Sequence, residues 1–307
     1  MPLFVNATRL PYLTAILVPV LLGGAVAFHD GYVNIPLLLI TLVAVALFHL
    51  GSNAMNDYFD HLSGADEANQ NPGPFFGGSR VIQNGLLKPR QVLALALALY
   101  ALGSCLGFII AFWSGHPVEV VLLGLIGIGI GVLYTAPPVQ LVHHGIGEFF
   151  LGIAFGPLIV VGADFVLSGA WSLEALYASL PVALLIIAVL YINEIPDRAW
   201  DAQAGKRTVV ARLPLRTAVN GYAVIMGVTY FVIAAGGVLN IIPLITLIAL
   251  ATLPLAWRAF TILRANYNAP YQMMPANAIT IQIHLQTGLL LVATYVVVGL
   301  FQIVKLW

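Results

Sequence analysis

The sequence is poor in charged residues and in cysteine. Only 8% of its 307 residues are charged, whereas 61% are hydrophobic. A soluble domain carries about 25% charged residues, so the composition excludes an ordinary soluble domain and indicates an integral membrane protein. The formal net charge is zero, so the chain lacks the basic footprint typical of nucleic-acid binding. Cys105 is the only cysteine, which excludes an internal disulfide and a thiolate-rich metal site.

Long apolar stretches are abundant. A helix that crosses a bilayer needs about 20 largely apolar residues. Residues 1–307 are expected to form a single polytopic all-α domain with nine transmembrane helices. The N-terminal stretch MPLFVNATRLPY lacks the features of a signal peptide, and we expect it to lead into the first helix. The predicted helices cover residues 10–28, 35–55, 92–113, 118–134, 146–161, 176–195, 218–236, 241–259 and 283–304.

Lysine and arginine are distributed unequally over the predicted loops. If the chain crosses the membrane nine times, the N-terminal segment and every second loop lie on one side. Eleven of the twelve lysine and arginine residues fall on that side, and only Lys305 falls on the other. Cytoplasmic loops of membrane proteins are enriched in these residues. We therefore predict a cytoplasmic N-terminus and location in the cell's inner (plasma) membrane.

Two acidic clusters follow the second and the sixth predicted helix. Four crossings separate NDYFDHLSGAD from NEIPDRAWDAQAGKRT, so both clusters lie on the same side of the membrane. Each begins with an asparagine that an aspartate follows four residues later, and on a helix this spacing puts both groups on one face. The cluster residues are Asn56, Asp60 and Asp66, and then Asn193, Asp197 and Asp201.

The spacing of the clusters is consistent with an internal repeat. Asn56 lies 137 residues before Asn193, and the same separation holds between Asp60 and Asp197. Each cluster is followed by a basic stretch that contains valine. We therefore expect duplication of a four-helix unit, as occurs in other membrane proteins.

The residue types in the clusters suit a Mg²⁺–diphosphate site. Mg²⁺ prefers carboxylate oxygens and commonly completes its coordination with water and substrate phosphates. All six cluster residues are therefore candidate ligands of Mg²⁺, with Mn²⁺ as a substitute. The nearby basic residues Arg80, Lys206 and Arg207 are expected to bind phosphate oxygens.

The surrounding apolar helices suggest a diphosphate that carries a lipid tail. With an allylic prenyl diphosphate, the metal and the basic residues would stabilise the departing diphosphate. An allylic cation would remain, which aromatic faces stabilise. Phe59, Tyr134 and Tyr191 are candidates for this role.

With these features the sequence resembles the UbiA superfamily of intramembrane prenyltransferases. The paired motifs carry the resemblance, together with TRLPYLTAILVPVLLG, GGSRVIQNGLL, and LYTAPP followed by GIGE. It extends to about Tyr222 and is strongest with the branch around 1,4-dihydroxy-2-naphthoate prenyltransferase. The resemblance implies a nine-helix bundle around a central cavity, with both motifs binding Mg²⁺ and diphosphate.

The resemblance also implies a reaction and its participants. Asn56, Asp60, Asp197 and Asp201 would be catalytic, and Arg80, Lys206 and Arg207 would bind diphosphate. The reaction would transfer a polyprenyl group to an aromatic acceptor in menaquinone-like quinone biosynthesis and release diphosphate. Homogentisate, 4-hydroxybenzoate, a chlorophyllide and a glycerol-phosphate lipid stay open as acceptors. Membrane lipid is an expected partner, whereas no protein partner is implied.

Several residues depart from the family pattern or lack an assigned role. His143 and His144 stand where family members commonly have lysine and arginine, and position 64 is glycine, as in the naphthoate branch. Asp57 and Glu194 adjoin motif residues but point about 100° away from them on a helix. Glu148, within GIGE, either contacts the acceptor or caps the fifth helix.

A secondary transporter is the alternative from another class. Transporters also have internal repeats and buried acids, but their sites lie near the middle of the bilayer. Every candidate metal ligand here is expected at the cytoplasmic end of a helix, and no acid is expected in the middle of one. The sequence therefore favours the enzyme.

Overall fold

The structure is a computed structural model that describes residues 3–69 and 72–305. Within these residues it is helical, with no strand beyond an isolated bridge between Gly73 and Phe76. The all-α prediction is confirmed. The longer elements are α2 (Thr14–His29), α3 (Ile35–Ser63), α5 (Pro89–Ser114), α6 (Pro117–Leu133), α9 (Leu173–Gln203), α11 (Leu215–Val238), α12 (Leu253–Asn266) and α13 (Pro270–Lys305).

Shorter elements complete the chain. One predicted span is built from three consecutive pieces, namely α7 (Gly147–Ile153), a π-helical turn η3 (Ala154–Leu158) and α8 (Ile159–Ser168). Another begins with the 3₁₀ segment η4 (Leu244–Thr252), which runs into α12. The remaining elements are α1 (Leu3–Ala7), η1 (Leu10–Leu13), α4 (Ala65–Ala68), η2 (Leu141–His144) and α10 (Val209–Arg212).

The chain is an integral multi-pass membrane protein, although the predicted count of nine spans is not confirmed. In residues 3–69 and 72–305, seven helical segments are long and apolar enough to cross a membrane. The first and fourth predicted spans correspond to α2 and α6, which are apolar but have only 16 and 17 residues. The outer surface is apolar as well, since Phe112 is 75% exposed and Phe231 is 69% exposed.

Local signals explain where the long helices begin and end. The Asn34 side chain accepts a hydrogen bond from the Leu37 amide at the start of α3, and Ser172 caps α9 in the same way. Gly64 ends α3 with a φ of 77°, a left-handed conformation that glycine adopts without strain. Because α3 and α9 both extend beyond the apolar stretch, α9 carries the whole second motif, whereas α3 carries Asn56 and Asp60 and α4 carries Asp66.

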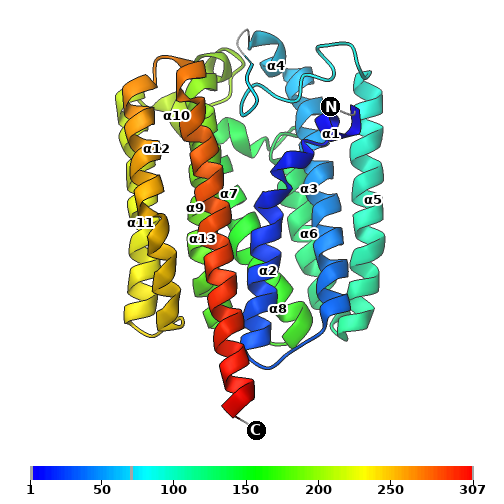
Figure 1. The fold of residues 1–307 in the computed structure, drawn as a ribbon. Coiled ribbons are helices and arrows are strands. Elements are labelled where there is room, and N and C mark those ends of the chain that lie inside the picture. The colour runs from blue at the N-terminus through cyan, green and yellow to red at the C-terminus, as the bar shows by residue number, and fades with distance from the viewer. Residues whose placement is uncertain (1–2, 70–71, 306–307) are drawn as a thin grey trace.

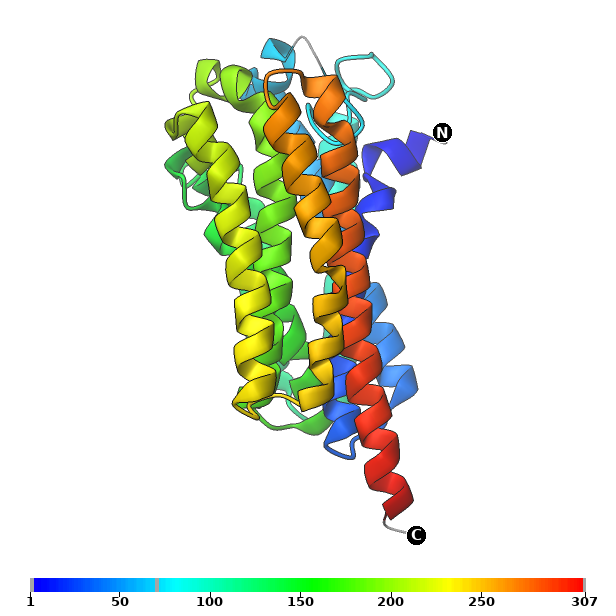
Figure 2. The same cartoon turned by 60° about the vertical axis from the view of Figure 1, so that its left-hand side comes forward.

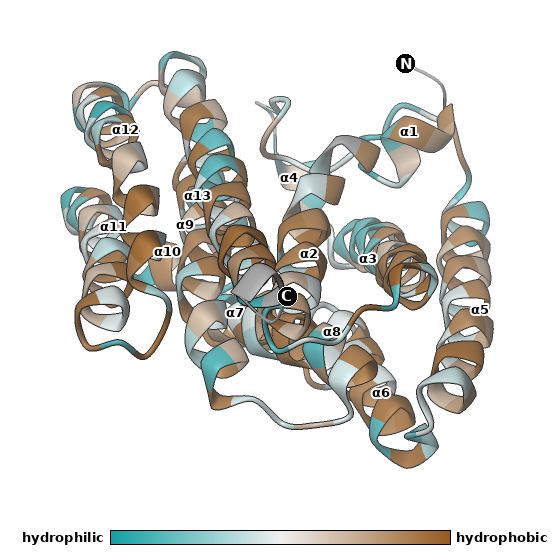
Figure 3. Ribbon diagram, turned by 60° about the horizontal axis from the view of Figure 1, so that its bottom comes forward, coloured by the Kyte–Doolittle hydropathy of each residue, from teal (hydrophilic) through white to brown (hydrophobic). Residues whose placement is uncertain are grey.

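The helices stand side by side, with short elements gathered at one end (Figure 1). That end holds α1, α4 and α10, whereas the C-terminal end of α13 lies at the other. A view turned by 60° shows α11, α12 and α13 forming one side of the bundle (Figure 2). Hydrophobic residues cover most of the length of the helices, and hydrophilic residues are concentrated toward their ends and in loops (Figure 3).

Two sequence-based boundaries were wrong. The fifth span was expected to end at residue 161, but α8 continues to Ser168 and carries the buried acid Asp164 within it. The second motif was expected in a polar connection, but α9 passes through Pro196 and continues to Gln203.

Candidate active site

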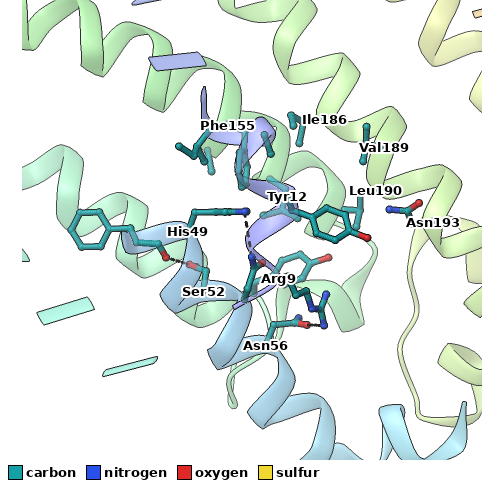
Figure 4. A pocket seen from close by; sticks show the side chains of 18 of the residues that line it. Arg9, Tyr12, His49, Ser52, Asn56, Phe155, Ile186, Val189, Leu190 and Asn193 are labelled. Atoms are coloured by element: carbon teal, nitrogen blue, oxygen red, sulfur yellow. Dashed lines mark hydrogen bonds between the residues drawn. The ribbon is translucent and has the colours of Figure 1, made fainter. Parts of the chain in front are cut away.

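A cavity of about 1210 Å³ opens among the helices and reaches both acidic motifs. Its polar end is formed by motif residues and basic side chains, and its deeper wall is mostly aliphatic. Figure 4 shows side chains from the N-terminal segment, α3, η3 and α9 around this space. The polar lining includes Arg9, Asn56, Asp60, Asp66, Asn69, Arg80, Asn193, Glu194, Asp197, Asp201 and Lys206.

The last turns of α3 present the first motif. Asn56 and Asp60 both line the cavity, which confirms that the four-residue spacing places them on one face. Asp57 lies between them in sequence, is buried, and forms an ion pair with Arg9. Arg9 also approaches the side-chain oxygen of Asn56 at 3.5 Å. The N-terminal segment therefore contributes a cation to the first motif.

The far end of α9 presents the second motif, and contacts from other segments hold it. Asp197 accepts hydrogen bonds from the Asn69 side chain at 2.8 Å and from the Gly77 amide at 3.0 Å. Asn193 accepts one from the buried Asn277 of α13 at 2.8 Å. The loop after α4 and the last helix therefore orient this motif.

Lys206 connects the two motifs. Its Nζ lies 2.8 Å from an oxygen of Asp60 and 3.9 Å from one of Asp201, and the residue is 8% exposed. Burial lowers the pKa of Lys206, but Asp60 and Asp201 outweigh burial and raise it overall. Lys206 therefore carries a positive charge between the two acidic clusters.

The other two predicted phosphate-binding residues are placed differently. Arg80 lines the cavity, and its guanidinium donates to the backbone oxygen of Asp66. Arg207 is exposed and is not among the lining residues, while its carbonyl accepts a hydrogen bond from Arg212 at 2.8 Å. The structure therefore brings Arg80 and Lys206 to the motifs, but not the side chain of Arg207.

The motif residues fit a hard divalent cation such as Mg²⁺. Asp66 is 5% exposed, and one of its oxygens has no hydrogen-bond partner. Burial, with the nearby charges of Asp60 and Asp57, raises the pKa of Asp66 to about 8. A buried carboxylate group with an unpaired oxygen is costly unless a cation or a proton compensates it. The cluster ligands are all oxygen donors, which is the set that Mg²⁺ prefers.

Two further acids lie beside the second motif. Glu148 is buried and accepts a hydrogen bond from the Val209 amide at 2.7 Å, while its other oxygen has no partner. Glu194 is buried, lines the cavity and also has one oxygen without a partner. Glu148 therefore holds the start of α10, whereas Glu194 faces the cavity.

The aromatic lining only partly follows the sequence prediction. Tyr134 lines the cavity, but Phe59 and Tyr191 are not among the lining residues. Phe155 lines it instead, because the π-helical turn η3 interrupts the span at that point. Its ring lies edge-to-face against His49, with the ring centroids 5.4 Å apart (Figure 4).

His143 and His144 lie in η2, outside the residues that line the cavity. His144 is exposed and His143 is half-buried. Burial and the charge of Lys206 lower the pKa of His143, which favours its neutral form. The lowered pKa of His143 therefore disfavours the positive charge that a lysine or arginine would supply at this position.

Sequence reasoning missed three residues that shape the site. Arg9 entered only as a charge in the loop count, and Asn69 and Asn277 were not considered. Their partners Asp57, Asp197 and Asn193 lie 48, 128 and 84 residues away in the sequence, so spacing could not reveal the pairs. The signal for Arg9 was its place in TRLPY, a stretch that already carried the family resemblance.

Comparisons with known proteins agree with these features. The UbiA prenyltransferase family model matches residues 16–285. A 1,4-dihydroxy-2-naphthoate octaprenyltransferase from Bacillus subtilis is 33% identical over 223 residues, which cover 73% of this chain and 70% of that protein. A 2-carboxy-1,4-naphthoquinone phytyltransferase from Synechocystis is 25% identical over 299 residues, covering 97% and 94%.

The fold agrees with that of a solved structure. A UbiA homologue from Archaeoglobus fulgidus bound to DMAPP and Mg²⁺ has a TM-score of 0.64, with 15% identity. The match covers 94% of this chain and 99% of that one. At this identity the likeness concerns the fold alone.

Proposed function

Because the chain belongs to the UbiA prenyltransferase family, we propose that it transfers a polyprenyl group from a prenyl diphosphate to a naphthoate-type aromatic acceptor. The reaction releases diphosphate and serves menaquinone-type quinone biosynthesis. The observation that carries the proposal is a single cavity. Both acidic motifs and three basic side chains lie at its polar end, and an apolar wall lies beyond them. Such a cavity suits a substrate with a charged head and a hydrocarbon tail.

The polar end binds the diphosphate. Lys206, Arg80 and Arg9 line the cavity, and their positive charges would bind its phosphate oxygens. The six motif residues would hold Mg²⁺, or Mn²⁺ in its place: Asn56, Asp60, Asp66, Asn193, Asp197 and Asp201. When bound, the metal supplies positive charge that stabilises the leaving diphosphate. Arg207 is exposed outside the cavity, so a contact with diphosphate would require its side chain to move.

The apolar wall holds the tail and the reacting carbon. Ile186, Val189 and Leu190 line this part of the cavity. As the carbon–oxygen bond to diphosphate breaks, positive charge develops on the allylic carbons. The rings of Tyr134 and Phe155 line the cavity and stabilise such a charge through their faces. Exclusion of water by the apolar wall protects the cation from hydrolysis.

Alkylation of the acceptor leaves a proton to be removed from its ring. Among the described lining residues, Glu194 is the carboxyl group that belongs to neither metal-binding set. We assign it as the proton acceptor, in competition with diphosphate itself. Glu194→Gln should lower turnover while prenyl diphosphate binding stays within about twofold of the parent. Unchanged turnover would show that Glu194 is not the proton acceptor.

The naphthoate acceptor rests on the two named relatives, because both act on naphthalene-ring substrates by name. The purified protein should be given prenyl diphosphates of several lengths with 1,4-dihydroxy-2-naphthoate, homogentisate or 4-hydroxybenzoate, each with and without Mg²⁺. Mass spectrometry should find a prenylated naphthoate that EDTA abolishes. If product forms only with another acceptor, the protein is still a prenyltransferase but the proposed naphthoate acceptor is wrong.

A further inference from the structure

A second polar cluster lies at the end of the bundle opposite the acidic motifs. His29 is the last residue of α2, Asp30 follows it, and Glu174 lies in the first turn of α9. One ligand atom from each of these side chains lies within 4.8 Å of the others. Because α9 runs the length of the bundle, Glu174 and the motif residue Asp201 lie near its opposite ends (Figure 1).

A fully buried carboxylate on α8 lies near the same cluster. Asp164 is 0% exposed, and neither of its oxygens has a hydrogen-bond partner. The charged residues that act on its carboxylate are Asp30 and Glu174. Asp164 therefore adds a third negative charge near the cluster from the protein interior.

Helix α13 closes the cluster on its remaining side. The ring of Tyr295 packs edge-to-face against His29, with centroids 5.7 Å apart. Its buried hydroxyl faces Glu174 without meeting the geometry of a hydrogen bond. The side-chain nitrogen of Gln302 lies 3.1 Å from Nε2 of His29, and Nδ1 of His29 lies 3.0 Å from an oxygen of Asp30. Tyr295 and Gln302 therefore hold the His29 ring with Nδ1 toward the carboxylates.

The charges in the cluster do not balance. Asp30, Asp164 and Glu174 are three acids, and His29 is the only basic side chain paired with any of them in the described part of the chain. Asp164 is fully buried, and burying a carboxylate beside other acids without compensation is unfavourable, so a cation is expected near them. Imidazole nitrogen together with carboxylate oxygens suits Zn²⁺ better than Mg²⁺, which prefers oxygen alone.

We propose that His29, Asp30 and Glu174 bind a divalent transition-metal ion, represented by Zn²⁺, with the buried acid Asp164 nearby adding negative charge. The site is separate from the proposed Mg²⁺–diphosphate site. It joins α2, α8 and α9 at the end of the bundle farthest from the reaction. The bound ion stabilises the packing of these helices, because it replaces repulsion among three acids by attraction to one cation.

The test is Zn²⁺ binding by the full-length protein in detergent. The protein is first stripped with a chelator and then kept in excess Mg²⁺, so that the oxygen-rich motifs are occupied. Elemental analysis after gel filtration should find one Zn²⁺ per chain, and Zn²⁺ should raise the melting temperature. His29→Ala and Glu174→Gln should each weaken Zn²⁺ binding at least tenfold and abolish the shift.

Two control variants separate this site from other acids. Glu119→Gln changes an acid in the first turn of α6 at the same end of the bundle, and should keep Zn²⁺ binding. Asp60→Asn changes the first acidic motif and should also keep Zn²⁺ binding. Loss of Zn²⁺ in Asp60→Asn but not in Glu174→Gln would place the ion at the motifs and overturn the proposal.

A further variant covers the case in which a substitution prevents folding. The Asp30 side chain is 39% exposed, so Asp30→Asn should leave the metal-free melting temperature unchanged. It should nevertheless weaken Zn²⁺ binding at least tenfold. Zn²⁺ binding equal to that of the parent in Asp30→Asn, or no Zn²⁺ binding by the parent itself, would also overturn the proposal.

Discussion

Lys206 is a single residue that interacts with both acidic motifs. It reaches Asp60 from the first motif at 2.8 Å and Asp201 from the second at 3.9 Å. A lysine between two acidic clusters reduces their mutual repulsion and leaves positive charge close to the place of the diphosphate. The two motifs therefore act as one unit, although α3 and α9 carry them separately.

Substitution of the motif aspartates tests this unit. Asp60→Asn and Asp197→Asn keep the side-chain shape but remove the charge proposed to bind metal, so each should lower turnover by at least about 100-fold. The double variant should be little worse than either single one, because cooperating groups are not additive. Glu67→Gln changes an exposed acid beside the first motif, and its turnover should stay within about twofold of the parent. Near-normal product formation in either aspartate variant would contradict the assignment.

The pKa of Asp66 predicts that metal and protons compete. Burial holds this pKa at about 8, so the carboxyl group is mostly protonated at pH 7 when no metal is bound. Apparent Mg²⁺ affinity should therefore rise as the pH increases toward 8 and level off above it. Titration calorimetry at pH 7 in buffers of different ionisation enthalpy should detect proton release on Mg²⁺ binding. Asp66→Asn should reduce that release, and an affinity independent of pH between about 6 and 9 would contradict the prediction.

The same pKa has a consequence for stability. An acid whose folded-state pKa is raised binds its proton more tightly in the folded protein than in the unfolded chain. In the metal-free protein, the stability that Asp66 contributes is complete below its ordinary pKa of 3.8 and is lost as the pH rises to about 8. Mg²⁺ should therefore raise the melting temperature more at pH 8 than at pH 6.

At the scale of elements, the loop between α4 and α5 completes the site. It supplies the Gly77 amide that binds Asp197, and Gly78 lies directly against Asp66. Gly78 has a φ of +76°, and a Cβ atom there would lie 2.6 Å from both oxygens of Asp66. The loop therefore depends on glycine both for its backbone conformation and for its close approach to the motif.

A matched pair of glycine substitutions tests that close approach. Gly85 lies in the same loop with a φ of +67° but has no atom within 4 Å of its added Cβ. Both Gly78→Ala and Gly85→Ala carry a backbone cost of about 1 kcal/mol. Only Gly78→Ala should also lower turnover, by about tenfold or more, because it displaces the proposed metal ligand Asp66. Equal turnover in the two variants would show that the contact with Asp66 is unimportant.

The elements also show how far sequence reasoning could go. Apolar length located the helices, and the spacing of Asn56 and Asp60 predicted a shared face because both properties are local. The ends were less predictable: α8 continues past Asp164 and α9 past Pro196, since packing in the bundle supports polar residues and proline there. The contact between Asn69 and Asp197 depends on the whole fold, and no local pattern records it.

At the scale of the whole molecule, the open question is orientation. We expect the acidic motifs to face the cytoplasm, because the lysine and arginine bias places their loops there. Single cysteines at Ser79 and Gln203, in a Cys105→Ser background, should react with an impermeant reagent only from the cytoplasmic side. A cysteine at Asn240, at the other end of the bundle, should react only from outside. Labelling of positions 79 and 203 from opposite sides would contradict a joint site.

The asymmetry of the cavity also bears on how the products leave. Its polar end gathers basic side chains and proposed metal ligands, whereas its deeper wall is aliphatic. Once the carbon–oxygen bond has broken, the prenylated ring no longer carries the group that this polar end holds, and it can partition into the surrounding lipid. Inorganic diphosphate keeps every one of those contacts. We therefore expect strong product inhibition by diphosphate, competitive with the prenyl donor, and weak inhibition by the prenylated ring.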